Sequence, residues 1–341
     1  MKKGILILGL LTALNAYADE LPSCGENCTY SYVENGVGND NNPTYTLTIS
    51  PIDSSKPASI RGYDRIRHGD DYAPWINPNI TQVEIKEGIK TIGVHAFENM
   101  NGADRTLILP EGLETIGTEA FHGFNATSVT FPSTLKIIDS YAFDGYLQKI
   151  NNLPEGLETI GSAAFANSQL TDVVIPNSVT NLSAYAFGSS EAGWNYSRIS
   201  NLYCSKAQQA GCEAALAFRG DNATVTVYEI KDGLYFLDGA YYSSADNMQK
   251  DVLAQKNATG ESFACDDLAQ CKADVLKRKG YCKDDSDCLA MAKSNVINYK
   301  NKSYASIDDL FSGNYIPKRI YTVDEANAVA GSTNHVKIRY R

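Results

Sequence analysis

Histidine and carboxylate side chains are the first groups in this 341-residue chain that could carry chemistry, and their spacing decides which chemistry is open to them. No histidine shows metal-ligand spacing or belongs to a set that could be named nucleophile, base and orienting group. Adjacent carboxylates such as Asp70-Asp71 and Asp284-Asp285 are expected as solvated charge in loops, because a buried unpaired carboxylate is costly. The sequence therefore predicts no catalytic residue, no cofactor and no metal site, and a protein that is not an enzyme. The four histidines are His68, His95, His122 and His335.

Eight cysteines, all beyond residue 18, indicate disulfide bonds. An even count in an exported chain is typical of a disulfide framework. The C-x-x-C spacing of zinc knuckles and redox sites does not occur. Connectivity does not follow from sequence, but sequential pairing is expected because close neighbours meet most often in the unfolded chain. The expected pairs are Cys24–Cys28, Cys204–Cys212, Cys265–Cys271 and Cys282–Cys288.

Arg219-Gly220-Asp221 is the tripeptide that many integrin ligands use, with opposite charges presented at the tip of a loop. The simpler interpretation is a Gly-Asp turn that leads into a strand near Val225. Both interpretations stay open, and the tripeptide is a speculative partner-binding site.

Residues 1–18 have the composition of a secretory signal peptide. Lys2-Lys3 provide a positive start, residues 5–14 an apolar run, and Ala16-Tyr17-Ala18 a cleavage site. Removal of this segment would change the formal net charge from −10 to −12, which disfavours nucleic acid as a partner. We therefore expect an exported protein in the periplasm, at the cell surface or secreted, with no membrane insertion after cleavage.

The elements that must position these groups belong to a repeat. Five copies of one phrase end in Ala-Phe, and their phenylalanines follow one another after 24, 22, 22 and 22 residues. A fixed period of this size predicts a solenoid, because each unit is too small to bury its own apolar face. The copies are IKEGIKTIGVHAF, LPEGLETIGTEAF, FPSTLKIIDSYAF, LPEGLETIGSAAF and IPNSVTNLSAYAF, and their phenylalanines are Phe97, Phe121, Phe143, Phe165 and Phe187.

Each copy predicts one strand, one turn and one helical corner. In residues 170–187, Val173 and Ile175 alternate as in a strand, Pro176 ends that strand, and the Ala-Phe segment is expected as one helical or 3₁₀ turn. Successive strands would stack as a parallel sheet, with the five phenylalanines as an internal column. A positive φ is expected at the glycines after isoleucine, which are Gly93, Gly117 and Gly161.

The outward strand positions are mostly small and polar, without the tryptophan, tyrosine or arginine cluster that dominates binding energy. A solvated sheet face is the simpler interpretation, and a ligand groove is the alternative. These positions are Gln82, Glu84, Thr106, Ile108, Ser128, Thr130, Asn151, Asn152, Asp172 and Val174.

The repeated phrase over residues 80–187 resembles the BspA-type leucine-rich repeat of exported bacterial proteins. The earlier segments CGENCTYSY, TLTIS and YAPW look like the N-terminal cap of such proteins. The resemblance implies a leucine-rich-repeat solenoid in a secreted or cell-surface protein of the adhesion and interaction class, with no catalytic residues to carry over.

The expected fold class is α+β: a short solenoid with a parallel sheet, a β-rich cap before it and a small disulfide-containing module after it. The boundaries are a signal peptide at 1–18, the N-terminal cap at 19–79, the five repeats with their C-terminal cap at 80–228, and the α+β module at 229–341. In the module, Ser306 and Asp309 have the spacing of a helix capping box.

These observations favour an interaction protein that binds a protein or a glycan at the cell envelope or outside the cell. One alternative is a periplasmic or envelope scaffold whose repeats only space its two ends. The other is an enzyme sited in residues 229–341, although no catalytic set can be named there.

Overall fold

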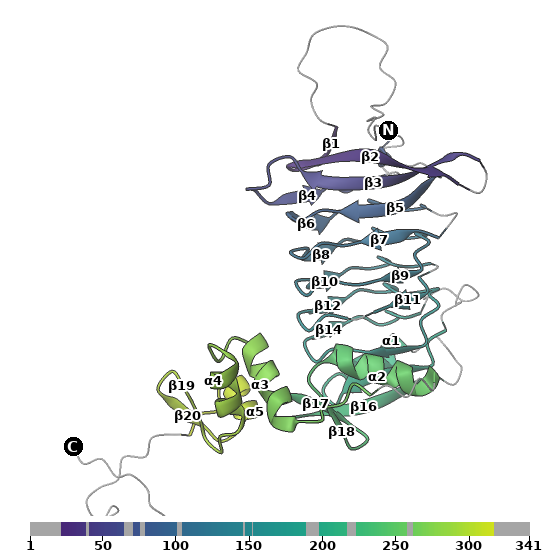
Figure 1. The fold of residues 1–341 in the computed structure, drawn as a ribbon. Helices are drawn as coiled ribbons and strands as arrows, with labels where there is room; N and C mark the ends of the chain where they lie inside the picture. The colour runs from purple at the N-terminus through teal and green to yellow at the C-terminus, as the bar shows by residue number, and fades with distance from the viewer. Residues whose placement is uncertain are drawn as a thin grey trace, which may run out of the picture. The chain divides into compact units, whose positions relative to one another are not determined.

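The computed structural model divides into two compact units. The repeat unit contains the chain up to Ile230 together with Tyr235–Ala264, and the C-terminal unit contains Lys231–Leu234 and the chain from Cys265 onward. This contact boundary lies later in the chain than the change of composition at residue 229. The structure describes residues 22–38, 41–64, 71–75, 79–100, 104–145, 147–151, 153–188, 198–216, 223–257 and 262–316 (Figure 1).

Each coil of the repeat unit adds a short strand to each of two faces, so the expectation of one strand per coil was incomplete. On the first face, parallel pairing joins β5 to β7, β9 to β11, and β13 to β15. On the second face, a continuous parallel sheet has the order β14-β12-β10-β8-β6-β4. The strands of the first face are β5 (Ile80–Ile85), β7 (Thr106–Ile108), β9 (Ser128–Val129), β11 (Lys149–Ile150) and β13 (Asp172–Val174). Those of the second face are β4 (Ala58–Ile60), β6 (Ile89–Ile92), β8 (Thr115–Ile116), β10 (Ile137–Ile138), β12 (Thr159–Ile160) and β14 (Asn181–Leu182).

The corner after each second-face strand is a series of turns, not the helical turn that the sequence predicted. Its amides donate to the next coil: Phe97 N–H to the Ala120 carbonyl at 2.7 Å, and Phe121 N–H to the Ala142 carbonyl at 2.9 Å. The residue before each Ala-Phe pair has a positive φ, which interrupts any helix. These left-handed residues are His95, Glu119, Tyr141, Ala163 and Tyr185, with φ between 53° and 64°.

The repeat glycines are required by close contact between coils, so the expectation of a positive φ there was wrong. A Cβ on Gly93 would lie 2.3 Å from the Arg61 backbone, and one on Gly161 would lie 2.4 Å from the Ser140 amide nitrogen. Real Cβ atoms do not approach backbone so closely. The glycine therefore admits the preceding coil, and the positive φ falls two residues later.

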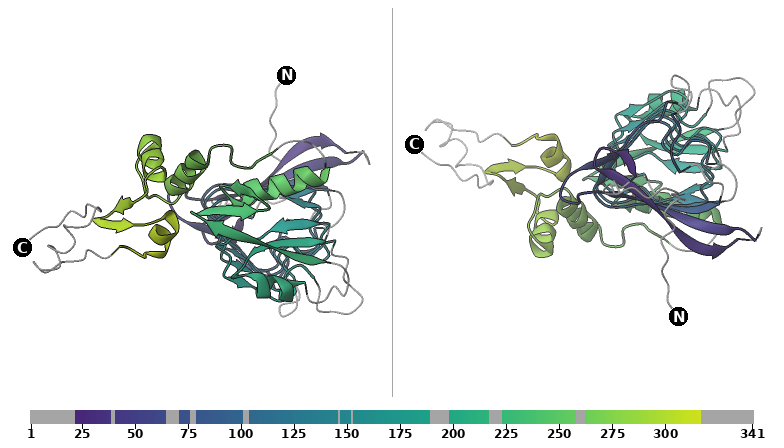
Figure 2. Two further views of the ribbon diagram at one scale, coloured as in Figure 1. Left: turned by 90° about the horizontal axis from the view of Figure 1, so that it is seen from below. Right: turned by 90° about the horizontal axis from the view of Figure 1, so that it is seen from above.

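The five repeat phenylalanines lie inside the coils as one column of stacked rings. Each is at most 3% exposed, and their neighbouring ring planes are within 12° of parallel. Trp75, 22 residues before Phe97, extends the column: its ring lies 5.3 Å from that of Phe97, and its indole N–H donates to the Ala96 carbonyl at 2.9 Å. Figure 2 views the coils along the stack, where they overlie one another. The successive ring centroids within the column are 5.1, 5.1, 5.9 and 5.4 Å apart.

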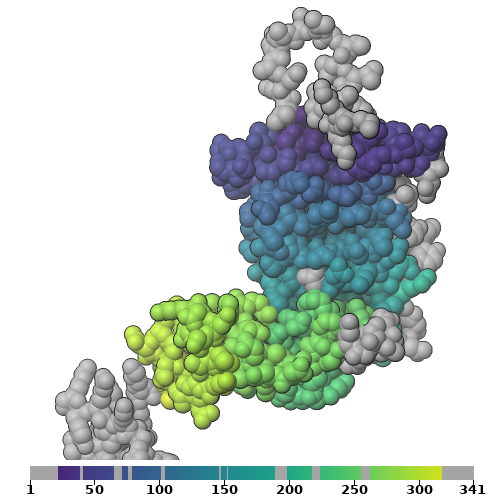
Figure 3. Space-filling model, viewed as in Figure 1, coloured from purple at the N-terminus to yellow at the C-terminus, as the bar shows by residue number. Residues whose placement is uncertain are grey.

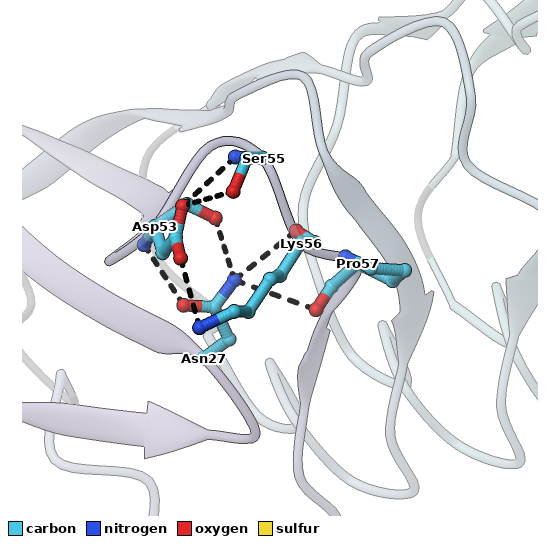
Figure 4. Close-up of polar contacts among 5 residues, drawn as sticks. All are labelled: Asn27, Asp53, Ser55, Lys56 and Pro57. Carbon is cyan, nitrogen blue, oxygen red and sulfur yellow. Dashed lines mark hydrogen bonds and ion pairs between the residues drawn. The ribbon is translucent and has the colours of Figure 1, made fainter.

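The N-terminal cap covers the first coil with an antiparallel sheet that continues in parallel into the repeats. β1 (Ser23–Gly25), β2 (Cys28–Val37) and β3 (Pro43–Pro51) form this sheet, and β3 pairs with β5. Asn27, in the β1–β2 turn with φ 51°, accepts from the Asp53 amide and donates to the Asp53 and Lys56 carbonyls at 2.8 and 3.1 Å (Figure 4). One side chain therefore ties the first turn of the cap to the loop before β4.

The repeat unit ends in a second cap. β15 (Asn201–Ser205) and β16 (Thr224–Lys231) continue the first-face sheet in parallel, and α1 (Gln209–Ala215) lies between them in the chain. β17 (Leu234–Leu237) and β18 (Ala240–Tyr242) form a hairpin, and α2 (Ala245–Asn257) follows.

Among the described residues, β13 is the edge strand of its sheet. A side chain of helix α2 bonds to the outer edge of this strand. The Gln249 amide accepts from Val174 N–H at 2.7 Å and donates to the Asp172 carbonyl at 2.9 Å. Both backbone groups flank Val173 on the side away from β15, where a neighbouring strand would bond them. Gln249 is only 4% exposed, so it replaces that strand in a buried position.

The C-terminal unit is a small α+β body with its own core. Its core side chains are Leu276, Ile297, Tyr304, Ile307 and Leu310. The Asp308 carboxylate accepts from the Asp232 and Gly233 amides, and Ser306 Oγ accepts from Asp309 N–H, as the capping-box spacing predicted. The elements are α3 (Leu268–Arg278), α4 (Asp285–Ala292), β19 (Ile297–Tyr299), β20 (Lys302–Tyr304) and α5 (Ile307–Ser312).

Replacement of a central ring should destabilise the whole stack. Phe143→Ala is expected to lower the free energy of unfolding by about 3–5 kcal/mol, because it leaves a cavity between two stacked neighbours. Val94→Ala, at a 41% exposed side chain of a corner, should change it by less than about 0.5 kcal/mol. Urea unfolding measures both, and an unchanged midpoint for Phe143→Ala would contradict a supporting role for the column.

Gln249→Ala should cost roughly 2–5 kcal/mol, because the Val174 N–H and Asp172 carbonyl would remain buried without partners. Gln249→Glu should cost at least as much as Gln249→Ala at neutral pH, because a buried carboxylate would face the Asp172 carbonyl without a donor. Gln209→Ala, on the surface of α1, is the matched control, and its change in the free energy of unfolding should be near zero. Equal unfolding midpoints for all three variants in urea would show that the edge of β13 does not depend on α2.

Reduction should open the C-terminal unit before the coils. Two of its local loops are closed by disulfides, each worth roughly 2 kcal/mol, and its core is small. Hydrogen exchange with and without reductant should show lost protection in α3 and β19, while the Phe121 and Phe143 amides stay protected. Parallel loss in both places would mean that the coils depend on the same bonds.

Candidate functional site

The structure places the cysteines in four local disulfides, and no described cysteine is free. The bonds join Cys24 to Cys28, Cys204 to Cys212, Cys265 to Cys271 and Cys282 to Cys288. The first two are buried in the two caps of the repeat unit, where they fix the ends of the stack. The tripeptide Arg219-Gly220-Asp221 lies outside the described residues.

The outward positions of the first face are not one continuous solvated surface. Thr106 and Ser128 are exposed, but Asp172 and Val174 on β13 are 3% and 2% exposed, respectively. Helix α2 covers β13 through Gln249, and Val174 joins a core with Met248 and other α2 and hairpin residues. The expectation of an outward face was therefore wrong for the last coil, because the sequence of one repeat does not show what packs on it. Asn152 lies outside the described residues.

A groove runs beside the first-face strands. It has a volume of about 540 Å³ and is lined by Asp104, Asn125, Gln148 and Gln169. Each residue comes from a different coil, shortly before its first-face strand. Amide side chains both donate and accept hydrogen bonds, so this groove presents a polar column suited to hydroxyl or peptide groups. Figure 3 shows the coils that build it as successive layers.

A second group of polar side chains lies at the corners of the first two coils. His95 Nδ1 is 3.0 Å from a Glu98 carboxylate oxygen and 3.4 Å from one of Glu119. His122 Nδ1 is 3.8 Å from Glu98 and 3.6 Å from Glu119. We call these four residues the corner cluster. Ligand atoms of His95, Glu98 and Glu119 lie within 4.8 Å of one another, with His122 beside them, and imidazoles with carboxylates can hold a cation.

The family model for BspA-type leucine-rich repeat regions matches residues 73–192, with six copies. The stacked parallel strands and the buried phenylalanine column are the structure that this repeat predicts. Residues 73–192 form a BspA-type leucine-rich repeat region. The match counts one copy more than the five Ala-Phe phrases. Leucine-rich repeat proteins of this kind are generally non-catalytic.

Solved structures similar to this chain are bacterial leucine-rich repeat proteins. One from Eubacterium ventriosum is 23% identical, with a TM-score of 0.37 over 48% of this chain and 40% of that chain. A leucine rich cell surface protein from Faecalibacterium prausnitzii is 19% identical, with a TM-score of 0.30 over 67% of this chain and 61% of that chain. This chain thus spans less than two thirds of either one. No curated protein matches it.

The corner cluster of the BspA-type repeats was not found from the sequence, which predicted no metal-ligand spacing for the histidines. His95 and His122 are 27 residues apart, which is the first repeat step of 24 plus 3. A search for ligands at one repeat plus three residues would therefore have paired them. The two side chains differ in burial: His95 is 17% exposed and its Nδ1 is buried, whereas His122 is 37% exposed.

Asp144, on the next coil of the BspA-type repeats, adjoins the corner cluster. Its Oδ2 is 3.7 Å from His122 Nε2, and its Oδ1 accepts from the Asn167 amide at 2.8 Å. Burial raises the pKa of the Asp144 carboxyl, although the hydrogen bond from Asn167 and the nearby His122 act to lower it. Asp144 is thus held in place beside the second histidine.

The second face of the BspA-type repeats has a different charge pattern. Glu114 lies between Lys136 at 2.8 Å and Lys90 at 3.7 Å, each on a neighbouring coil. The hydrogen bond from Lys136 lowers the pKa of the Glu114 carboxyl, and the same bond raises the pKa of Lys136. These ion pairs are exposed to water and contribute little to stability. Their alternating signs keep like charges from lying next to each other on successive coils.

Across the described part of the chain, no helix has both the length and the apolar character needed to cross a bilayer.

Proposed function

We propose that this protein is an exported interaction protein that binds a protein or a glycan at the cell envelope or outside the cell. The observation that carries the proposal is the repetition itself. The stacked coils present the same side-chain position again and again along one line, as in the polar groove. A surface of this kind contacts an extended partner at several equivalent points.

The groove is the binding surface we favour. Asn125, Gln148 and Gln169 offer donors and acceptors at successive coils, and Asp104 adds a charge at one end. The second face is less suitable, because its Lys–Glu pairs already satisfy one another. The groove residues include no aromatic ring, so individual contacts should be weak and affinity should depend on how many coils the partner spans.

Export is supported by the four disulfides, since such bonds persist in oxidising compartments and are rare in the cytosol. Adhesion at the cell surface is the form of interaction that the repeat family suggests. A non-catalytic envelope scaffold is the second candidate, favoured by the two caps that close both ends of the stack and leave it as a spacer.

The test combines fractionation with site-specific crosslinking in the native host. A photo-crosslinking residue at Gln148 should capture a partner in the envelope or extracellular fraction. The same residue at Thr115, on the second face, is the matched control and should capture none. The triple variant Asn125→Ala/Gln148→Ala/Gln169→Ala should lose the partner while keeping the wild-type unfolding midpoint.

Three outcomes would count against this function. Recovery of the protein in the cytosol with reduced cysteines would contradict export. Equal capture from Gln148 and Thr115 would contradict the groove as the binding surface. Capture from neither position, with the protein in the envelope fraction, would favour the scaffold.

A further inference from the structure

We propose that the corner cluster binds one zinc ion between the first two coils, with His95, Glu98, Glu119 and His122 as ligands. The proposal concerns a different part of the repeats from the polar groove and does not depend on what the groove binds. It rests on the distances between the four side chains, on the lack of a hydrogen bond at both Nδ1 atoms, and on Asp144, which faces His122.

The ligand atoms have the spacing of a tetrahedral site. With metal–nitrogen and metal–oxygen bonds of about 2.0–2.2 Å, neighbouring ligand atoms of a tetrahedron lie about 3.3–3.5 Å apart. His95 Nδ1 lies 3.0 Å from Glu98 Oε2 and 3.4 Å from Glu119 Oε2. His122 Nδ1 lies 3.6 Å from the same Glu119 oxygen but 3.8 Å from the other Glu98 oxygen, Oε1, so His122 must rotate to complete the set. One ligand atom each of His95, Glu98 and Glu119 lies within 4.8 Å of the other two. Small rotations of the side chains would complete the site around a central ion.

Both histidines aim an unsatisfied nitrogen at this point. Nδ1 of His95 and Nδ1 of His122 are buried, and neither makes a hydrogen bond despite the nearby carboxylates. A buried polar atom without a hydrogen bond is costly. The carboxylate oxygens at 3.0–3.8 Å therefore do not satisfy these two nitrogens. A metal ion would take the lone pairs of both nitrogens.

The donor set selects the ion. Two imidazole nitrogens with two carboxylates suit zinc, whereas calcium and magnesium take six or more oxygen ligands. The eight cysteines are bonded to one another in the described structure, so no thiolate competes for the ion. Four protein ligands close the coordination sphere, which is typical of a structural zinc site.

The fold holds the ligands in advance. His95 and Glu119 occupy the left-handed corner position, with φ 56° and 54°, and their amides donate to the following coils at 3.0 and 2.9 Å. The same position carries tyrosine or alanine in the other coils, so this backbone conformation belongs to the repeat. Only the first two coils carry a metal-ligand side chain both at this left-handed position and three residues after it: His95 with Glu98, and Glu119 with His122.

Asp144 is a positioning residue in this site. A histidine bound to a metal through Nδ1 commonly presents its other nitrogen to a carboxylate, which fixes the ring. Asp144 Oδ2 faces His122 Nε2 at 3.7 Å, and the Asn167 amide anchors the opposite oxygen. The third coil would thus orient a ligand that belongs to the second.

Isothermal titration of the untagged, chelator-treated protein with Zn²⁺ tests the proposal. Wild type should bind one equivalent, unaffected by millimolar Ca²⁺, with a rise in the thermal midpoint. His95→Asn, which keeps a residue that tolerates positive φ, should lose this binding, as should Glu98→Gln. Asp144→Asn should weaken it about 10- to 100-fold. Co²⁺ in place of Zn²⁺ should give the intense visible absorption of a tetrahedral complex.

Glu114→Gln removes a carboxylate from the lysine pairs of the second face and is the control, so it should bind zinc as wild type does. Circular dichroism and the metal-free thermal midpoint show whether each variant folds. Absence of stoichiometric binding in wild type would overturn the proposal. Wild-type affinity in both His95→Asn and Glu98→Gln, or displacement of zinc by millimolar Ca²⁺, would overturn it as well.

Discussion

The fixed distance between coils is the constraint on which the repeat unit depends. Backbone ladders on two faces and at the corner set the rise, and the buried rings of Phe97 and Phe121 match it with a centroid distance of 5.1 Å. Neither interaction can form within one coil, because a coil has no partner for its own ladder amides and contributes one ring to the column. The two caps are therefore part of the same constraint: β3 and Trp75 continue the ladder and the column at one end, and β15 continues the ladder at the other.

Because the coils stack at a fixed rise, equivalent surface residues of successive coils form a column in which neighbours are about 5 Å apart. Identical charges in such a column would repel one another, as like charges on paired strands do. The second face avoids this with Lys90, Glu114 and Lys136 on successive coils. The corner cluster alternates as well, since histidine precedes glutamate on the first coil and follows it on the second. In water the first pattern gives exposed ion pairs, and at the partly buried corner the second gives the ligand set of the proposed zinc site.

The repeat period was sufficient to predict the solenoid and the parallel stacking of its strands, because a 22-residue unit is too small to bury its own apolar side chains. The predictions that were wrong concern features set by contacts between coils. Gly93 is set by the approach of Arg61 on the preceding coil, and the positive φ falls on His95 instead. The corner cluster was missed because spacing was judged along the chain, where His95 and His122 are distant, and not across one repeat. The burial of Asp172 could not be predicted from a repeat at all, because α2 belongs to another segment.

The place where α2 docks lies next to an irregularity in the repeat. The segment LQKINNLP, between Leu147 and Pro154, carries one residue more than its counterpart LTDVVIP before Pro176. Among the described residues, β13 has no strand neighbour on the side of its Val174 amide and Asp172 carbonyl, so these two groups need another partner. Gln249 supplies both bonds, and Glu155, just beyond the irregular segment, accepts from the Tyr235 hydroxyl at 2.9 Å and the Ala245 amide at 2.6 Å. The cap is thus attached next to the irregular coil through side chains that bond to backbone amides and a carbonyl, and those bonds do not depend on the exact repeat period.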